Sequence, residues 1–315
     1  PDVLFGQGGS AAWADASIIC PWQIYLTYGN KEILERQFES MKKWVAYMQK
    51  NSKKFIWTKG NHFGDWLCLD KDIGNEPTDK KLIATAFSAY STSLFVKAGK
   101  VLGRDMGKYE LLGKNIKQAF CKKYIKDGFV LENTQTACAL VLYFDLYDDK
   151  APVAAQLEGL VKKYGHLTTG FVGTPYLLHA LTANGYAKTA YDLLLRKEYP
   201  SWLYPVGLGA TTIWERWNGI RTDGTMEDKG MNSFNHYAYG AVGDWLYGTM
   251  AGINIDETAP GFKHIIFKPV PDDRIDFVKG SVLSRHGEVK AEWRRENGKV
   301  TYTFTVPQGC TATAV

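Results

Sequence analysis

The sequence predicts a mainly α-helical protein, an α/α toroid, followed by a small antiparallel β domain. From about residue 10 to residue 255, apolar residues recur at spacings of three and four, the period of amphipathic helices. The predicted helices follow one another in pairs, about ten in all, which is more than a four-helix bundle uses. After Ala259-Pro260-Gly261 the pattern changes to short alternating runs. We therefore expect a helical domain at residues 1–257 and a β domain at residues 258–315.

The composition is that of a globular protein. The 315 residues are 45% hydrophobic and 23% charged, which excludes a disordered or fibrous chain and is enough for a large core. The net charge of +5 comes from scattered basic residues without a block of like charges, so no nucleic acid or membrane partner is expected. The five cysteines are widely spaced and form no metal-binding motif, so neither a disulfide framework nor a metal site is expected.

The clearest single helix is predicted from Asn30 to Gln49. Asn30 is a suitable N-cap, and Glu32 in the first turn is favoured by the helix dipole. One face of this helix collects the apolar side chains Ile33, Leu34, Phe38, Met41, Trp44, Val45 and Met48.

The remaining helices follow from the same apolar stripes. Two stripes run from Leu82 to Leu94 and from Tyr109 to Tyr124. Thr174 reads as a helix cap, with Pro175 at the first helical position. Further helices are predicted at 134–147, 152–164, 174–184, 186–197 and 232–250.

Three connections are long and rich in glycine, aromatic and acidic residues: 52–78, 165–173 and 198–230. Loops of this length on a compact helical scaffold are usually functional. In the β domain, the runs GEVKAEW and KVTYTFTV are joined by Glu296-Asn297-Gly298, which predicts a hairpin. The strands are too few to close a sandwich, so this domain is expected to be small or to continue beyond residue 315.

Three segments place a carboxylate beside indole rings, and each lies at a loop or helix start. Aromatic residues make up 14% of the chain, and flat ring faces suit the C–H faces of sugars. Hydrolysis of a glycosidic bond needs two carboxyl groups and side chains that grip the sugar. The three segments therefore suggest a sugar site, with the candidate residues Trp13, Asp15, Asp65, Trp66, Trp214, Glu215 and Trp217.

Each candidate also has a purely structural interpretation. Glu215, between two tryptophans in a long loop, is the best catalytic candidate, but it could instead form an ion pair with Arg216 that pins the loop. Asp15 and Asp65 could be helix N-caps. His236, at the start of a predicted helix, could be a structural histidine rather than a ligand contact.

Four phrases in this order resemble the bacterial and fungal α-L-rhamnosidases of glycoside hydrolase family 78. They are GSAAWADASIICPWQIYLTYGN, FGDWL, TTIWERWNGI and MNSFNHYAYGAVGDWLYGTMAGI, and the resemblance covers nearly the whole chain. It implies an (α/α)6 barrel followed by a C-terminal β-sandwich. It also implies inverting hydrolysis of terminal α-L-rhamnosides without a metal or organic cofactor.

By the same resemblance, Glu215 corresponds to the general base that activates water. His236 corresponds to a sugar-hydroxyl contact, and Asp15 and Trp66 to members of the sugar-binding subsite. Asp65 either contacts sugar or shapes the loop. The plausible walls of the site are Trp13, Trp214 and Trp217.

The sequence departs from the family pattern in one respect. The general acid of the family lies in an acidic, arginine-containing segment upstream of the WADA phrase, and no such segment is present. We therefore expect the first helices of the barrel and the general acid to be missing from this chain, which alone would be inactive.

Two alternatives remain open at this point. The first is another helical-toroid glycosidase or a glycoside phosphorylase, and the second is a non-catalytic carbohydrate-binding relative. A rhamnose-containing glycoside or polysaccharide is the expected partner, and such substrates favour a periplasmic or secreted location. The oligomeric state is not indicated by the sequence.

Overall fold

The computed structural model describes residues 9–315, so the first eight residues of the predicted helical domain lie outside the described part. The chain forms two compact units, each assembled from three segments that are far apart in the sequence. Among the described residues, the first unit comprises residues 9–12, Asn51–Ala89 and Lys114–Val242, and the second comprises Trp13–Lys50, Tyr90–Gly113 and Gly243–Val315.

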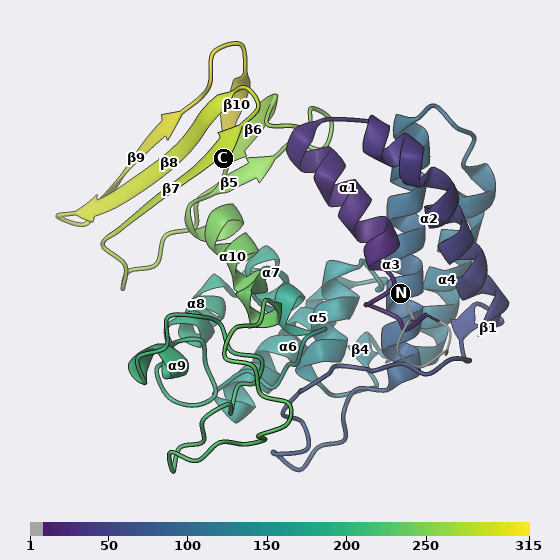
Figure 1. Cartoon of the computed structure of the whole chain (residues 1–315), viewed down its shortest axis with the longest axis horizontal. Helices are drawn as coiled ribbons and strands as arrows, with labels where there is room; N and C mark the ends of the chain where they lie inside the picture. The colour runs from purple at the N-terminus through teal and green to yellow at the C-terminus, as the bar shows by residue number, and fades with distance from the viewer. Residues whose placement is uncertain (1–8) are drawn as a thin grey trace. The chain divides into compact units, whose positions relative to one another are not determined.

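Helices dominate up to residue 250 (Figure 1). They are α1 (Ala16–Tyr28), α2 (Glu32–Lys50), α3 (Lys80–Val101), α4 (Gly107–Tyr124), α5 (Gln135–Tyr143), α6 (Lys150–Tyr164), α7 (Thr174–Ala183), α8 (Ala187–Leu195), α9 (Leu203–Gly207) and α10 (Val242–Trp245). Two small ladders join β1 (Ser52–Lys53) to β2 (Ile56–Trp57) and β3 (Ile125–Lys126) to β4 (Phe129–Val130). In the first unit α5 packs against α6 and α7, and α7 packs against α8. Among the described residues, no helix has both the length and the apolar character that crossing a membrane requires.

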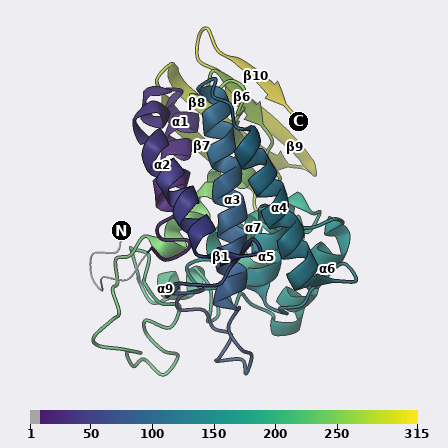
Figure 2. The ribbon, with the colours of Figure 1, turned by 90° about the vertical axis from the view of Figure 1, so that its right-hand side faces the viewer.

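Helix α2 confirms the prediction for 30–49. The Asn30 side-chain oxygen accepts the main-chain N–H of Glu32 at 3.0 Å, as an N-cap does. In the second unit α2 runs beside α1 (Figures 1 and 2). Its buried face contains Leu34, Phe38, Met41, Val45 and Met48.

Two helix predictions need correction. The N-cap of α7 is Gly173 rather than Thr174, whose hydroxyl instead pairs with that of Thr169 at 2.8 Å. The predicted helix over 232–250 begins only at Ala238, and it passes from a 3-10 turn through α10 into a π turn. Residues 232–237 are not helical because their backbone groups bond across the preceding loop.

The β region forms two three-stranded sheets, β10-β6-β5 and β7-β8-β9. The strands are β5 (Ile253–Ile255), β6 (His264–Phe267), β7 (Phe277–Ser284), β8 (Gly287–Glu296), β9 (Lys299–Thr305) and β10 (Thr311–Ala314). The predicted hairpin is confirmed, since Glu296 pairs with Lys299 and both turn residues, Asn297 and Gly298, have positive φ.

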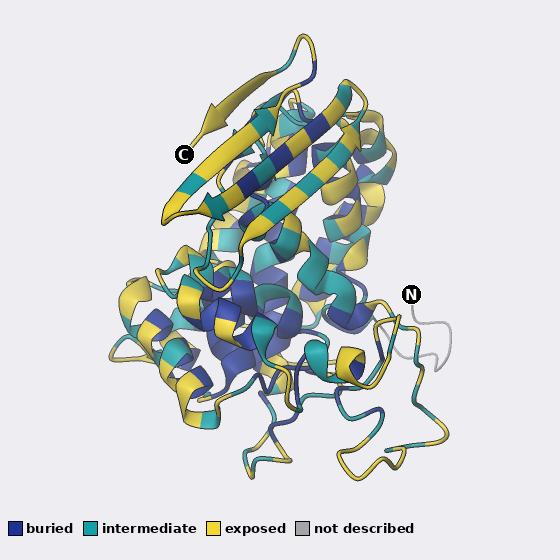
Figure 3. Ribbon diagram, turned by 90° about the vertical axis from the view of Figure 1, so that its left-hand side faces the viewer, coloured by how far each residue is buried: buried dark blue, intermediate teal, exposed yellow. Residues whose placement is uncertain are grey.

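The prediction of a purely antiparallel β domain is wrong for one pair, because β10 runs parallel to β6. Parallel strands need a crossover connection, and the β7-β8-β9 sheet is that connection. The two sheets share one core, in which the rings of Phe267 and Phe304 stack at 4.3 Å. Figure 3 shows buried and exposed residues alternating along β8, whose inward side chains are Val289, Ala291 and Trp293.

Candidate active site

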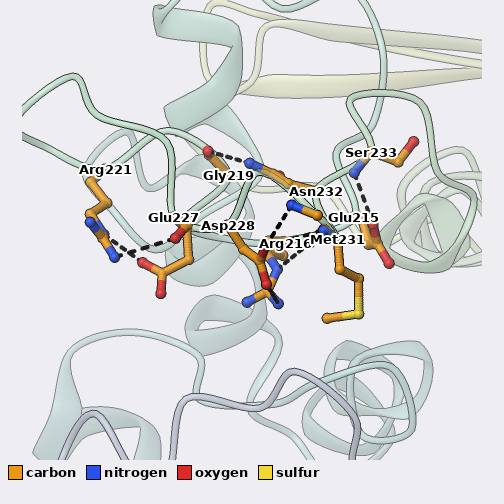
Figure 4. Close-up of polar contacts among 10 residues, drawn as sticks. Glu215, Arg216, Gly219, Arg221, Glu227, Asp228, Met231, Asn232 and Ser233 are labelled. Carbon is orange, nitrogen blue, oxygen red and sulfur yellow. Dashed lines mark hydrogen bonds and ion pairs between the residues drawn. The ribbon is translucent and has the colours of Figure 1, made fainter.

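Glu215 lies in the long loop between α9 and the 3-10 turn that begins at Ala238. Its main-chain N–H donates to the Ser233 carbonyl oxygen at 2.8 Å, and the Ser233 N–H donates to Glu215 Oε2 at 2.8 Å (Figure 4). The two residues are therefore bound twice across the loop. This pairing orients a half-buried carboxylate.

Other contacts cross the same loop. Arg216 donates through Nε to the Met231 carbonyl oxygen at 2.8 Å and pairs with Asp228 at 3.5 Å (Figure 4). The N–H groups of Gly230 and Met231, and then Arg216, lower the pKa of Asp228. The alternative in which Arg216 pairs with Glu215 is thus wrong, because the guanidinium is engaged elsewhere.

The tip of the loop is closed by two further interactions. Arg221 pairs with Glu227 at 2.5 Å, and the Asn232 side-chain amide donates to the Gly219 carbonyl oxygen at 2.7 Å (Figure 4). The loop is therefore braced along its whole length by polar contacts, which suits a segment that must hold a carboxylate in one place.

Trp217 is packed into the first unit rather than presented to solvent. Its indole N–H donates to the Thr169 carbonyl oxygen at 2.9 Å, its ring stacks on Tyr239 at 3.8 Å, and the edge of Trp202 approaches at 5.3 Å. Only 3% of Trp217 is exposed, and these contacts support the loop from inside the first unit. Trp217 also lines the same hollow as Trp214, so its place in the wall of a sugar site stays a prediction.

Trp214 is also buried, with its ring edge-to-face against Phe234 at 5.0 Å. Trp214 nevertheless lines a hollow in the first unit. The empty volume of this hollow is about 330 Å³, which includes space open to solvent. The hollow is lined mainly by apolar side chains, among them Trp202, Val206 and Ile213.

His236 follows the loop directly. Its Nδ1 accepts the main-chain N–H of Ala238 at 3.2 Å, and its ring lies 5.0 Å from Phe171 and 5.2 Å from Tyr237. Since Nδ1 is an acceptor, the neutral ring carries its proton on Nε2. That tautomer can donate a hydrogen bond to a hydroxyl group.

Asp65 is buried, and both of its carboxylate oxygens accept hydrogen bonds. Oδ1 accepts the N–H groups of Val172 at 2.8 Å and Gly173 at 3.0 Å, while Oδ2 accepts the Gly170 N–H at 2.8 Å and the Thr136 hydroxyl. Burial raises the pKa of Asp65, and these donors oppose the rise. The geometry matches the loop-shaping role rather than direct contact with sugar.

Trp66, next in the chain, is 36% exposed and packs edge-to-face on Phe63 at 6.0 Å. It is the candidate indole of the first unit that presents a ring to solvent. An exposed ring of this kind can stack on the apolar face of a sugar.

Asp15 and Trp13 belong to the second unit. Asp15 occupies the N-cap position of α1, but its side chain caps nothing. Its Oδ1 accepts the indole N–H of Trp44 at 2.8 Å and the Ser91 hydroxyl at 2.5 Å, and the residue is fully buried. Trp13 is half-buried. The N-cap alternative is therefore wrong for this side chain.

Three further residues near the candidate site were not proposed from the sequence. Asp70 is buried in the 52–78 loop, where burial and, secondarily, the charge of Asp65 raise its pKa to about 6. Phe171 and Tyr239 connect His236 to Trp217 through ring contacts. The sequence signal for Asp70 and Phe171 was the unusual length of their loops, and Tyr239 lies within one of the four family phrases. Among residues 9–315, no group of three or more His, Cys, Asp or Glu side chains is arranged to hold a metal ion.

Two known protein families together match nearly the whole chain. Residues 1–250 match the family described as bacterial alpha-L-rhamnosidase 6 hairpin glycosidase domain, so this is a glycosidase-type helical domain. Residues 252–315 match the bacterial alpha-L-rhamnosidase C-terminal domain. The chain belongs to the bacterial α-L-rhamnosidase family, which confirms the resemblance carried by the four sequence phrases.

Individual relatives agree with this assignment. An α-L-rhamnosidase of Streptomyces avermitilis is 38% identical over 96% of this chain and 29% of its own length, and one of Formosa agariphila is 39% identical over 99% and 34%. The crystal structure of the Streptomyces avermitilis enzyme complexed with L-rhamnose superposes with a TM-score of 0.92, at 36% identity over 97% of this chain and 29% of that one. The Aspergillus terreus enzyme gives 0.91, at 31% identity over 98% and 37%. The chain thus spans about a third of the length of these relatives.

Proposed function

We propose that the protein, in its full natural length, removes terminal α-L-rhamnose from rhamnosides by an inverting mechanism with Glu215 as the general base. The observation that carries this proposal is the double pairing of Glu215 with Ser233, which fixes a half-buried carboxylate in a braced loop. A general base needs such fixed geometry toward the water it deprotonates.

In this mechanism the Glu215 carboxylate takes a proton from water as the water oxygen attacks the anomeric carbon. A second carboxyl group, on the opposite side of the sugar, protonates the leaving oxygen. In inverting enzymes the two carboxyl groups lie about 6.5 to 9.5 Å apart. We assign that acid to a part of the protein upstream of this chain, as the family pattern implies. The proton on His236 Nε2 is directed to a sugar hydroxyl, and Trp66 stacks on the ring.

The same proposal includes the fold of each domain and the cellular location of the protein. We assign the helices up to residue 250 to an (α/α)6 toroid and the strands from Ile253 onward to a β-sandwich, supported by the helix pairs and by the core that the two sheets share. The predicted boundary at residue 257 thus moves ahead of β5, which pairs with β6. We also assign Asp15 and Trp13, in the second unit, to sugar binding on the basis of the family resemblance alone. A periplasmic or secreted location suits a glycoside or polysaccharide substrate.

A phosphorylase needs cationic or N–H donors for phosphate beside its active carboxylate. The two arginines that follow Glu215 in the sequence, Arg216 and Arg221, are paired with Asp228 and Glu227. These ion pairs favour hydrolysis over phosphorolysis.

The test uses turnover of p-nitrophenyl α-L-rhamnoside, with the first-formed anomer identified by NMR. We expect β-L-rhamnose, and a loss of about 10²-fold or more in kcat for Glu215→Gln, because a positioned base typically contributes 10² to 10⁴. Glu227→Gln, in the same loop, is the matched control and should retain activity. Full activity of Glu215→Gln would remove Glu215 from the mechanism, and the α-anomer as first product would exclude inversion.

A further inference from the structure

Asp65 links two separate parts of the first unit, α5 and the segment ahead of α7, to its own loop. Its donors are the hydroxyl of Thr136 in α5, the N–H of Gly170, and the N–H groups of Val172 and Gly173 ahead of α7. A carboxylate offers about four lone-pair sites, and four donors fill them. Asp65 therefore has no acceptor capacity to spare for a sugar hydroxyl.

The segment 169–173 that Asp65 holds contacts the candidate catalytic groups on both sides. The Thr169 carbonyl oxygen accepts the indole N–H of Trp217, two residues after Glu215, at 2.9 Å. The Phe171 ring lies 5.0 Å from the ring of His236. One five-residue segment thus supports both the loop of the proposed base and the proposed hydroxyl-binding histidine.

The segment is also bound to the residue after Asp65. The Phe171 N–H donates to the Trp66 carbonyl oxygen at 2.9 Å, which fixes the exposed indole relative to the same support. The loop that carries Glu215, the ring of His236 and the backbone of Trp66 therefore all contact one segment, and this segment is held by the buried carboxylate of Asp65.

We propose that Asp65 is a positioning residue that sets the placement of Glu215 and His236 through the segment 169–173, without touching substrate. Its catalytic consequence rests on the function proposed above, whereas its structural consequence does not. The chain of contacts runs from the Asp65 carboxylate to the backbone of 170–173, then from the Thr169 carbonyl to Trp217 and from the Phe171 ring to His236.

The decisive variant is Asp65→Asn, which keeps the shape but turns one acceptor oxygen into a donor that faces N–H groups. Hydrogen exchange followed by mass spectrometry should show faster exchange in peptides covering 165–176, and also in those covering 212–220 and 233–241. We expect kcat to fall about 10- to 100-fold, the scale of a small misplacement of catalytic groups, with KM changed less than about threefold. Asp72→Asn, an exposed carboxyl in the same loop, is the matched control and should leave both readouts unchanged.

Two milder substitutions, both at Thr136, test the proposal even if Asp65→Asn does not fold. Thr136→Val removes one donor from the Asp65 carboxylate and should shift exchange and kcat in the same direction by a smaller amount, while Thr136→Ser restores the hydroxyl and both readouts. Faster exchange confined to 165–176 would overturn the proposal. A rise in KM with unchanged exchange would also overturn it, since Asp65 would then act as a sugar ligand. If the wild type fails to hydrolyse rhamnosides, the proposed function fails, and the exchange pattern still decides the role of Asp65.

Discussion

Gly170 lies so close to Trp66 that a Cβ added to the glycine would stand 2.2 Å from the tryptophan carbonyl oxygen. The same atom would be 2.6 Å from the Cys68 nitrogen and 2.9 Å from the Asp65 carbonyl oxygen. All three neighbours are backbone atoms, which cannot swing aside as a side chain can. The absence of a side chain at residue 170 is what lets the two functional loops touch.

Gly170→Ala should therefore force the loops apart. We expect a loss of about 1 to 3 kcal/mol in the free energy of unfolding, as for an overpacked core, and a fall in rhamnosidase activity. Gly159→Ala is the control, because Gly159 lies in α6 with nothing within 4 Å of the added atom and should gain about 0.5 to 1 kcal/mol. Denaturant titration of both variants measures the difference, and equal stability of the two would contradict the close approach.

Arg216 braces the Glu215 loop from inside, with its side chain 14% exposed. A lysine cannot reproduce the planar fork that binds the Met231 carbonyl and Asp228 together. We expect Arg216→Lys to lower kcat about tenfold, through displacement of the neighbouring carboxylate.

Arg221→Lys is the comparison for that experiment. The Arg221 side chain is 45% exposed and pairs with Glu227. Exposed ion pairs contribute about 0 to 1 kcal/mol to the free energy of unfolding. The kcat of Arg221→Lys should stay within about twofold of wild type. If the two lysine variants have the same kcat, the contacts of Arg216 do not affect catalysis.

The raised pKa of Asp70 predicts that its contribution to stability depends on pH. Its pKa is raised to about 6, above the ordinary value of 3.8 that the unfolded chain has. Between these two values Asp70 is more protonated in the folded protein than in the unfolded one. The contribution of Asp70 to stability therefore falls as pH rises, and this loss is complete above about pH 6.

Asp70→Asn removes this titration. The variant should gain stability relative to wild type as pH rises from 4 to 7, by about 1 to 3 kcal/mol at most, since one pKa unit corresponds to about 1.4 kcal/mol. The control is Asp223→Asn, because the Thr225 hydroxyl and N–H lower the pKa of Asp223. Denaturation at pH 4.5, 5.5 and 7 measures both, and a pH-independent difference for Asp70→Asn would show that its carboxyl titrates normally.

Local patterns accounted for most of the secondary structure. The apolar stripe and Asn30 predicted α2 because a helix repeats its contacts every three to four residues, all within one short stretch of chain. Asn297-Gly298 predicted the hairpin because both positions need positive φ. The same reasoning placed the helix start at 232 instead of 238, since a local pattern does not reveal that Ser233 and His236 bond across a loop to Glu215 and Ile213.

The sequence by itself determined the mainly helical class of fold and the family, and it predicted Glu215 and His236 as site residues, because these depend on periodicity and on short phrases that are contiguous in the chain. Tertiary structure alone decided that Trp217 is buried against Tyr239, that Arg216 pairs with Asp228, and that Asp65 accepts hydrogen bonds from Thr136 and from residues 170–173. The partners of Asp65 lie as far as 108 residues away, and no rule of local spacing reports which donors will meet a carboxylate once the chain is packed.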